Sequence, residues 1–334
     1  MLTTKIEWHW DAPKQHKDFT PAFYVRLAAL AMAIINFLEN TISRIFQRFS
    51  QFYNRQKSHY VLNRYLNSSR KPFTPGYGLA KFSHIQDTLK DPVLLDIFRN
   101  NKPLPHRFGY AFDERVVEYP WVISKLSSSP SLLLDAGSTL NFESLALHPA
   151  LASKDLTIYT LAPENRCYWY HNISYHYGDL RSLPFRDNYF DEIITISTLG
   201  HVGLDNRIYT GEKLPPDSIY LDANHAALEL IRVLKPGGRL LGSVTFGKHQ
   251  YIKLSDNSIF AEQFDDRLLS NFMSSFSNCS SRDLTFYRYD SDGWNIATMK
   301  KCSDREYFNV HQSNQFDPDN AAAARGVALF DITK

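Results

Sequence analysis

The sequence is poor in cysteine: its 334 residues include only Cys167, Cys279 and Cys302, which lie far apart. There is no CxxC pair, so the spacing argues against both a zinc-finger type of metal site and a disulfide framework. Isolated cysteines of this kind are typical of small buried residues in a reducing compartment. The sequence therefore predicts reduced thiols, no metal site and a cytoplasmic location.

Strong charge and long apolar runs are also missing. The net charge is +2 and no dense basic run occurs, so nothing in the composition calls for a nucleic-acid partner. The most apolar stretch, Leu27 to Leu38, is shorter than the roughly 20 residues that a membrane-spanning helix needs. Residues 1–19 are polar and lack the apolar core of a signal peptide. We therefore expect neither a spanning helix nor a signal peptide.

Residues 21–56 have the pattern of one long amphipathic helix. Thr20 can cap it and Pro21 suits its first position. Apolar residues recur at steps of three and four, and basic residues outnumber the single acid, Glu39. Two interpretations remain open. The helix packs on its own domain or on a second copy of itself, or it lies on an anionic membrane surface as a peripheral contact.

Residues 68–107 are rich in proline, glycine and asparagine, which is typical of loops and short helices. We interpret them as a connector or partial lid that includes a short helix at 84–99. A second helix is expected over 113–126, broken or kinked by Pro120. The predicted organisation is a helical extension and connector at 1–109 followed by a catalytic domain at 110–334.

From residue 132 onward, predicted strands alternate with helices, which favours a mostly parallel α/β sheet covered on both faces. A helix at 217–234 is stopped by the PGG sequence that follows it. The expected strands begin with the LLLDAG run at residue 132 and continue at 156–161, 173–177, 192–197, 239–245, 284–289 and 326–332.

Three sequence runs carry a resemblance to a known family: LLLDAGSTLNFE, GDLRSLPFRDNYFDEII and VLKPGGRL. In this order they resemble the class I S-adenosylmethionine-dependent methyltransferases, over roughly residues 110–334. The resemblance implies a Rossmann-like sheet whose last strand is antiparallel, and S-adenosyl-L-methionine as cofactor. The runs TLAPEN and STLGHVGLDN narrow it to a subgroup often encoded among bacterial surface-polysaccharide genes, which implies a small-molecule or sugar acceptor.

The resemblance implies a cofactor site at the carboxyl ends of the strands. Asp135, Gly137 and Ser138 form the turn after the first strand, where Ser138 and its neighbours replace further glycines of the family pattern. Thr160 stands where the family places an acid for the ribose, and Glu164 is an alternative. Asp179 and Leu180 correspond to the adenine contacts. Ser197, at the end of the fourth strand, completes the predicted set, and for both Asp135 and Asp179 a turn-capping role is the alternative.

His201 is the candidate catalytic residue. It follows the fourth strand, at the sheet edge where the resemblance places the reactive methyl group, and Gly200 beside it replaces a glutamate of the subgroup. A histidine can act as general base toward a hydroxyl because its ordinary pKa is near neutral. Packing on the cofactor or ordering of the loop are alternative roles.

Together these features predict a methyltransferase that acts on oxygen of a sugar or polysaccharide precursor. The departures at Ser138, Thr160 and Gly200 keep open an alternative, a non-catalytic methyltransferase-like protein with a binding or scaffolding role. A nicotinamide dehydrogenase is disfavoured because no GxGxxG run follows a strand.

Overall fold

The computed structural model describes residues 28, 32, 56–211, 223–313 and 315–334. The chain divides into two compact units, residues 1–60 and 61–334. The helix predicted over 21–56 falls outside the described residues, apart from Ala28, Met32 and Gln56, which are helical. None of the helices within the described ranges is both long enough and apolar enough to cross a membrane.

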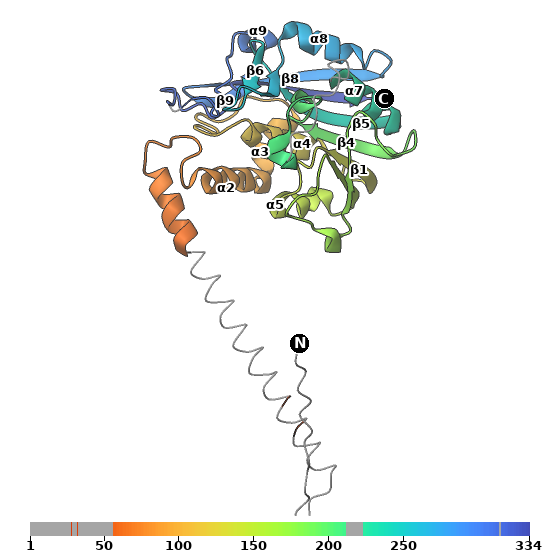
Figure 1. Ribbon diagram of the computed structural model, residues 1–334, viewed down its shortest axis with the longest axis horizontal. Coiled ribbons are helices and arrows are strands. Elements are labelled where there is room, and N and C mark those ends of the chain that lie inside the picture. The colour runs from red at the N-terminus through yellow and green to blue at the C-terminus, as the bar shows by residue number, and fades with distance from the viewer. Residues whose placement is uncertain (1–27, 29–31, 33–55, 212–222, 314) are drawn as a thin grey trace, which may run out of the picture. The chain divides into compact units, whose positions relative to one another are not determined.

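The second unit is built on an eight-stranded sheet with the order β3-β2-β1-β4-β5-β10-β8-β9 (Figure 1). The first five strands are mutually parallel, and β10 is antiparallel to both β5 and β8. The predicted Rossmann-like sheet with an antiparallel last strand is therefore confirmed. The strands are β1 (Ser131–Ala136), β2 (Lys154–Thr160), β3 (Ser174–Tyr177), β4 (Phe190–Ile196), β5 (Leu234–Thr245), β8 (Ser281–Asp290), β9 (Gly293–Ala297) and β10 (Gly326–Thr333).

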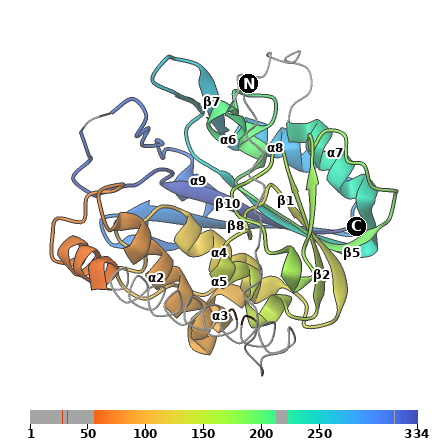
Figure 2. The same cartoon turned by 60° about the horizontal axis from the view of Figure 1, so that its bottom comes forward.

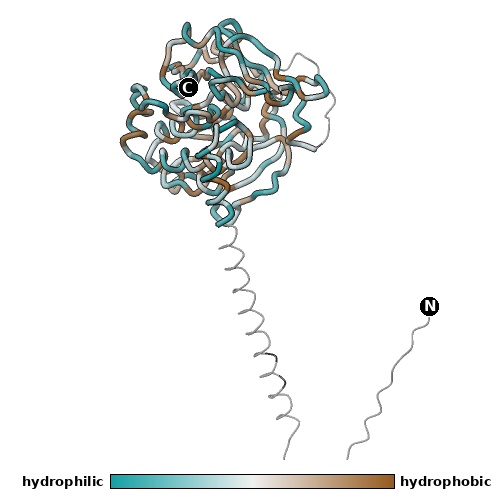
Figure 3. Tube along the Cα trace, turned by 90° about the vertical axis from the view of Figure 1, so that its left-hand side faces the viewer, coloured by the Kyte–Doolittle hydropathy of each residue, from teal (hydrophilic) through white to brown (hydrophobic). Residues whose placement is uncertain are grey.

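Successive residues of the central strands enter two different cores, as the period of two in a strand requires. Leu133 and Ile194 belong to the core on one face, and their neighbours Leu134 and Ile193 belong to the core on the other. Figure 3 shows hydrophobic stretches, in brown, along the trace of residues 61–334, interrupted by hydrophilic ones. Because both faces are buried, these strands read as nearly continuous apolar runs in the sequence.

Helices cover both faces of the sheet (Figures 1 and 2). On one side lie α2 (Tyr77–Lys90), α3 (Pro92–Arg99), α4 (Arg115–Lys125) and α5 (Glu143–Ala146), and on the other α7 (Ala223–Val233) and α8 (Asp266–Ser274). The short elements are α6 (Arg207–Thr210), α9 (Met299–Cys302) and the 3-10 turns η1 (Pro149–Leu151), η2 (Trp169–His171) and η3 (Leu199–His201). The sheet is thus the middle layer of a three-layer α/β unit.

Residues 68–107 are more than the connector that their composition predicted. Asp91 caps α3 by accepting hydrogen bonds from the backbone of Val93 and Leu94, and Pro92 occupies the first helical position. Leu89 of α2 and Phe98 of α3 are buried in the same core as the sheet. The predicted division at residues 109 and 110 accordingly falls inside the compact unit 61–334.

Helix α4 continues through Pro120, so this residue does not break the helix, which was one of the two expected effects of the proline. Every residue from Val116 to Ser124 is buried, and this packing outweighs the hydrogen bond that proline removes. Residues 126–130 connect the helix to β1. Arg115 and Tyr119 of the helix lie near the carboxyl ends of the strands.

One insertion was not predicted from the sequence. Between β5 and α8, strands β6 (Gln250–Lys253) and β7 (Ile259–Gln263) form an antiparallel hairpin with its own small apolar cluster. The hairpin packs against η3, and the backbone N–H of Asp205 donates to the carbonyl of Ile259 over 3.0 Å. It therefore flanks the segment that contains His201.

Candidate active site

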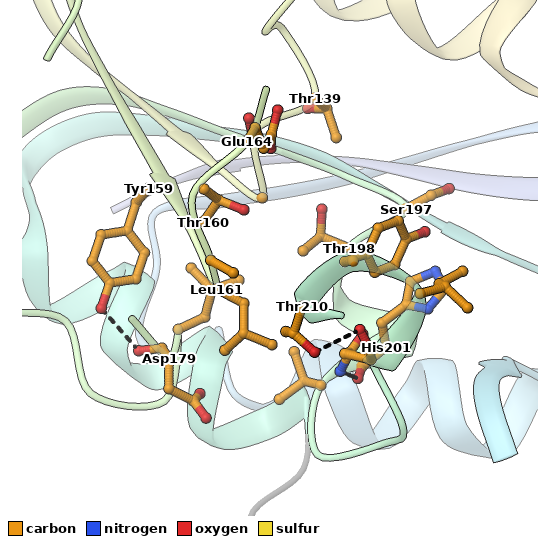
Figure 4. A pocket seen from close by; sticks show the side chains of 18 of the residues that line it. Thr139, Tyr159, Thr160, Leu161, Glu164, Asp179, Ser197, Thr198, His201 and Thr210 are labelled. Carbon is orange, nitrogen blue, oxygen red and sulfur yellow. Dashed lines mark hydrogen bonds between the residues drawn. The ribbon is translucent and has the colours of Figure 1, made fainter. Parts of the chain in front are cut away.

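A cavity of about 740 Å³ opens at the carboxyl ends of β1, β2, β3 and β4 (Figure 4). Parallel α/β sheets bind their ligands at this edge. Seven of the eight predicted site residues line the cavity: Gly137, Ser138, Thr160, Asp179, Leu180, Ser197 and His201. The structure thus brings together residues that are up to 64 positions apart in the sequence. Their assignment to a cofactor or a reaction remains a prediction.

Asp135 is the one predicted residue that does not line the cavity. It is fully buried, and its carboxylate accepts hydrogen bonds from the backbone of Thr139 and Leu140 and from the Thr139 hydroxyl, over 2.7–3.2 Å. Burial raises its pKa to about 6, although these hydrogen bonds favour the charged form. The contacts support the turn-capping alternative: Asp135 shapes the loop whose next residues face the cavity.

The loop after β1 is strained at the cavity wall. Gly137 has φ 121°, and a Cβ there would lie 2.1 Å from the Thr198 hydroxyl oxygen, so only glycine fits. Ser138 and, opposite it, Ser197 are non-glycine residues with φ of 58° and 44°. Left-handed conformations of this kind cost free energy and collect at functional sites.

The hydroxyl of Ser138 is buried and has no hydrogen-bond partner among the described residues. A buried hydroxyl without a partner costs about 1–3 kcal/mol. Because Ser138 also lines the cavity, this cost would be relieved by a ligand that offers a donor or an acceptor.

At the third strand end, Asp179 forms a salt bridge with Arg181, whose Nε and Nη2 donate to the carboxylate over 2.5–3.0 Å. Burial opposes ionisation of Asp179, but the hydrogen bonds from Arg181 outweigh it and hold the pKa of the carboxyl below its usual range. The backbone carbonyl of Asp179 accepts from Tyr159, as Figure 4 shows, and Leu180 packs beside it as a buried apolar residue. Asp179 is therefore a fixed anion at this side of the cavity.

A buried polar cluster, missed in the sequence, lies behind the fourth strand end. Arg115 of α4 lines the cavity and donates through Nη1 to Glu118 over 2.7 Å. The other oxygen of Glu118 accepts from the hydroxyls of Ser197 at 2.5 Å and Ser243 at 2.6 Å. Ser197 thus uses its hydroxyl inside the protein, while Arg115 brings a cation to the cavity. The i,i+3 spacing of Arg115 and Glu118 indicates a pair on one helix face, but no sequence signal places that pair at a ligand site.

His201 is fixed by the hairpin. Its Nδ1 lies 3.0 Å from the backbone carbonyl of Phe260, and the rings of the two residues are 4.5 Å apart. A carbonyl can only accept, so Nδ1 carries the proton and Nε2 carries the lone pair in the neutral ring. Burial lowers the pKa of His201 to about 4, which keeps the ring neutral at pH 7.

Close packing explains why the residue before His201 is a glycine. A Cβ on Gly200 would lie 2.8 Å from the carbonyl oxygen of Glu262 in β7. The hairpin therefore approaches η3 too closely to admit a side chain. The departure from the family pattern at Gly200 reflects this packing, and it need not reflect loss of function.

Residues 134–242 match the family model of a methyltransferase domain. The chain carries a methyltransferase domain. This match confirms the predicted enzyme class and, with it, S-adenosylmethionine as the methyl donor of the domain. No curated protein matches the chain significantly.

Several solved structures resemble the methyltransferase only distantly. The YcgJ protein of Bacillus subtilis is 17% identical over 65% of this chain and 97% of its own, with a TM-score of 0.40. A Burkholderia thailandensis 1,6-didemethyltoxoflavin-N1-methyltransferase, solved with S-adenosylhomocysteine, is 13% identical over 62% and 72%, with a TM-score of 0.37. A Thermotoga maritima protein described as a possible histamine N-methyltransferase is 12% identical over 76% and 100%, with a TM-score of 0.39. Likenesses at this level carry no conclusion about the acceptor.

Proposed function

We propose that this methyltransferase transfers a methyl group to a hydroxyl oxygen of a sugar or polysaccharide precursor. The observation that carries the proposal is the neutral His201 at the cavity, with Nδ1 occupied by Phe260 and Nε2 left to accept a proton. A hydroxyl acceptor loses its proton as the new bond forms, so a positioned base accelerates the reaction. The sugar class rests on the sequence resemblance, with the exposed ring of Tyr209 in the cavity wall as a stacking surface.

The cavity fits S-adenosylmethionine on three observations. Its volume of about 740 Å³ lies in the range of ligand pockets. The hydroxyl of Ser138 lacks a partner in the part of the chain that the structure describes, and Arg115 supplies a cation for a carboxylate at the same end. Asp179 and Leu180 offer an anion and an apolar surface for an adenine ring at the other end. When bound, the cofactor supplies a methyl group attached to a positively charged sulfur.

The protein's own residues prepare the site for a proton transfer. Phe260 holds the His201 ring in one tautomer through its carbonyl, and Gly200 lets the hairpin come close enough to do so. Glu118 fixes Arg115, and Ser197 and Ser243 fix Glu118 in turn. Positioning of this kind can supply a large part of the rate of a displacement at carbon.

Isothermal titration calorimetry with S-adenosylhomocysteine, combined with a radiolabelled methyl-transfer assay on sugar acceptors, tests the proposal. His201→Gln is expected to keep the affinity for S-adenosylhomocysteine and to lower the transfer rate by about 10²- to 10⁴-fold. His171→Gln, which changes an exposed histidine outside the cavity, is the matched control and is expected to leave both unchanged. Absence of heat at high micromolar S-adenosylhomocysteine would overturn the proposed function. A fully active His201→Gln would show that His201 is not the general base.

For residues 21–56 the two proposals from the sequence stand side by side: self-association, or a peripheral contact of a cytoplasmic protein with an anionic membrane. Flotation with anionic liposomes, with and without residues 1–57, distinguishes them. Equal flotation of the two chains would dismiss the membrane contact, and sedimentation of the full chain then reports self-association.

A further inference from the structure

The loop at 67–76, which leads into α2, lies at the outer edge of the second compact unit (Figures 1 and 2). The hydroxyl of Tyr65 donates to the backbone carbonyl of Arg70 over 3.1 Å. The side-chain amide of Asn320 donates to the carbonyl of Ser69 over 2.9 Å. These bonds fix the loop to the helical turn before it and to the C-terminal part of the chain.

Phe73 is the unusual residue of this loop. It is 46% exposed, and its φ of 57° lies in the left-handed region, which glycine and asparagine adopt far more easily than a bulky residue. Its ring lies 4.9 Å from that of Tyr77 but remains half exposed. Neither the local conformation nor burial therefore explains an aromatic residue here. An exposed ring on a fixed loop is instead typical of an interaction surface.

A second apolar side chain is exposed at the start of the loop. Leu66 is 37% exposed, and its carbonyl accepts a hydrogen bond from Nε of Arg70 over 3.2 Å. The loop thus combines an aliphatic and an aromatic side chain in contact with water, at positions that its own hydrogen bonds hold in place.

The charge around the loop has one sign. Residues 40–86 contain eight lysines and arginines and no aspartate or glutamate. Three of these cations, Arg64, Arg70 and Lys71, lie in or next to the loop, and no acid among the described residues forms a salt bridge with them. Unpaired cations beside exposed apolar groups suit an anionic bilayer, because the cations meet the headgroups while the apolar groups enter the interface.

We propose that this loop surface binds an anionic lipid bilayer. Its members are Arg64, Leu66, Arg70, Lys71 and Phe73. A membrane fits better than a nucleic acid because the aliphatic Leu66 cannot stack on a base. The contact belongs to the compact unit and is separate from the one proposed above for residues 21–56. It is also independent of the proposed methyl transfer, since none of its members lines the cavity.

Flotation of the full chain with phosphatidylcholine vesicles, with and without phosphatidylserine, is the first test. The chain is expected to float with the vesicles that contain phosphatidylserine and to bind neutral vesicles more weakly. Added salt should weaken the binding, because it shortens the range over which the cations and the headgroups attract each other. A full chain that stays unbound to anionic vesicles at low salt would overturn the proposal.

Phe73→Asn tests the apolar part of the contact. Asparagine tolerates a left-handed backbone, so the variant should fold, while loss of the ring is expected to weaken vesicle binding by about tenfold. Phe73→Trp should retain the binding, because tryptophan favours the membrane interface. Val93→Asn, which removes a 67% exposed apolar side chain from α3, is the matched control and should bind as the wild type does. Unchanged binding by Phe73→Asn would contradict the proposal.

The double variant Arg64→Gln/Lys71→Gln tests the charged part. Each cation near an anionic surface contributes about fivefold to the affinity, so the pair is expected to weaken binding by about 25-fold. Lys300→Gln/Lys301→Gln removes two exposed cations from α9 and causes the same change in net charge. This control should retain binding. An equal loss in both double variants would show a general attraction by net charge, and the loop surface would then not be the contact.

Two further measurements distinguish the remaining outcomes. If the loop variants lose affinity for a fluorescent single-stranded oligonucleotide but keep their binding to vesicles, the surface serves a nucleic acid and the proposal is wrong. All variants should keep the wild-type affinity for S-adenosylhomocysteine, because the loop lies outside the cavity lining. Failure of the vesicle tests would therefore leave the proposed methyl transfer intact, and failure to bind S-adenosylhomocysteine would leave the membrane contact intact.

Discussion

The two ends of the central sheet both contain buried polar groups, but only at the amino ends of the strands do all the groups compared here have partners among the described residues. At the amino ends of the strands, Lys154 donates to Glu192, to the hydroxyls of Ser127 and Ser131 and to the carbonyl of Ser129. Glu192 also accepts from the backbone of Ser127 at 2.9 Å and from the Ser131 hydroxyl at 2.7 Å. This network is closed, as buried ionic groups require.

The carboxyl ends are arranged differently. Ser138 has a buried hydroxyl without a partner among the described residues, and Ser138 and Ser197 have left-handed backbones. Arg115 lines the cavity, and within the described ranges only its Nη1 forms hydrogen bonds. Of the two groups compared here, only the one at the cavity combines left-handed serines with a buried hydroxyl that has no partner among the described residues, as expected where a protein reserves groups for a ligand. Left-handed residues and unpartnered polar atoms also occur elsewhere in the described part of the chain.

The largest effect is expected when the closed network is opened. Lys154→Met leaves Glu192 buried without its cation, which is expected to lower the free energy of unfolding by about 3–5 kcal/mol, measured by urea denaturation. Affinity for S-adenosylhomocysteine should be retained under folding conditions, because this network lies at the opposite edge from the cavity. A loss of binding in the folded variant would contradict the separation of the two ends.

Acidification should act through His201 at the cavity end. An unfolded histidine titrates near pH 6.5 and the folded His201 near 4, so between these values the unfolded state takes up the proton first. Stability is therefore expected to fall as the pH is lowered from about 6.5 to about 4, by up to about 3 kcal/mol. Urea denaturation of wild type and His201→Gln at several pH values in this range measures how much of the pH dependence of stability comes from His201. If stability depends on pH equally in both proteins, His201 does not cause the loss. In the free enzyme, the acid limb of kcat/KM should lie near 4.

The contact of the hairpin with η3 allows a third test. Gly200→Ala places a Cβ 2.8 Å from the carbonyl of Glu262, which is expected to cost about 1–3 kcal/mol and to slow methyl transfer by displacing Phe260 from His201. Gly78→Ala, in α2, meets no atom within 4 Å and should instead raise stability slightly. Thermal unfolding and the transfer assay on both variants check the pair, and equal behaviour would refute the packing argument.

The smallest effect gives the most direct comparison of the two ends. Ser138→Ala removes a hydroxyl without a partner and is expected to stabilise the free protein by about 1 kcal/mol, while weakening S-adenosylhomocysteine binding several-fold. Ser131→Ala removes bonds to Lys154 and Glu192 and is expected to destabilise by about 1–2 kcal/mol with no effect on binding. If Ser138→Ala raises stability and weakens binding while Ser131→Ala lowers stability and leaves binding unchanged, the difference between the two ends of the sheet is supported. If both variants change stability in the same direction and affect binding alike, that difference is refuted.

The central strands could be predicted from the sequence because their apolar runs reflect burial on both faces, as at Leu133 and Leu134. Cavity residues such as Gly137, Asp179 and His201 could be found because a parallel sheet collects its strand ends at one edge. The hairpin at 250–263 could not: its short strands carry little periodicity, and only three-dimensional packing reveals why Gly200 lacks a side chain. Arg115 was missed for a related reason, since its approach to the cavity depends on how α4 packs on the sheet.

The segment that the family model matches, residues 134–242, is smaller than the part of the chain that builds the site. Upstream of it, α4 contributes Arg115 and Tyr119 to the cavity wall, and α2 and α3 bury Leu89 and Phe98 under the sheet. Downstream, the carbonyl of Phe260 sets the tautomer of His201. A fragment cut at the borders of the matched segment would lose the core residues of α2, α3 and α4, and with them the carbonyl that orients its histidine. The smallest piece of this chain that can act on its own therefore extends well beyond the region that identifies it.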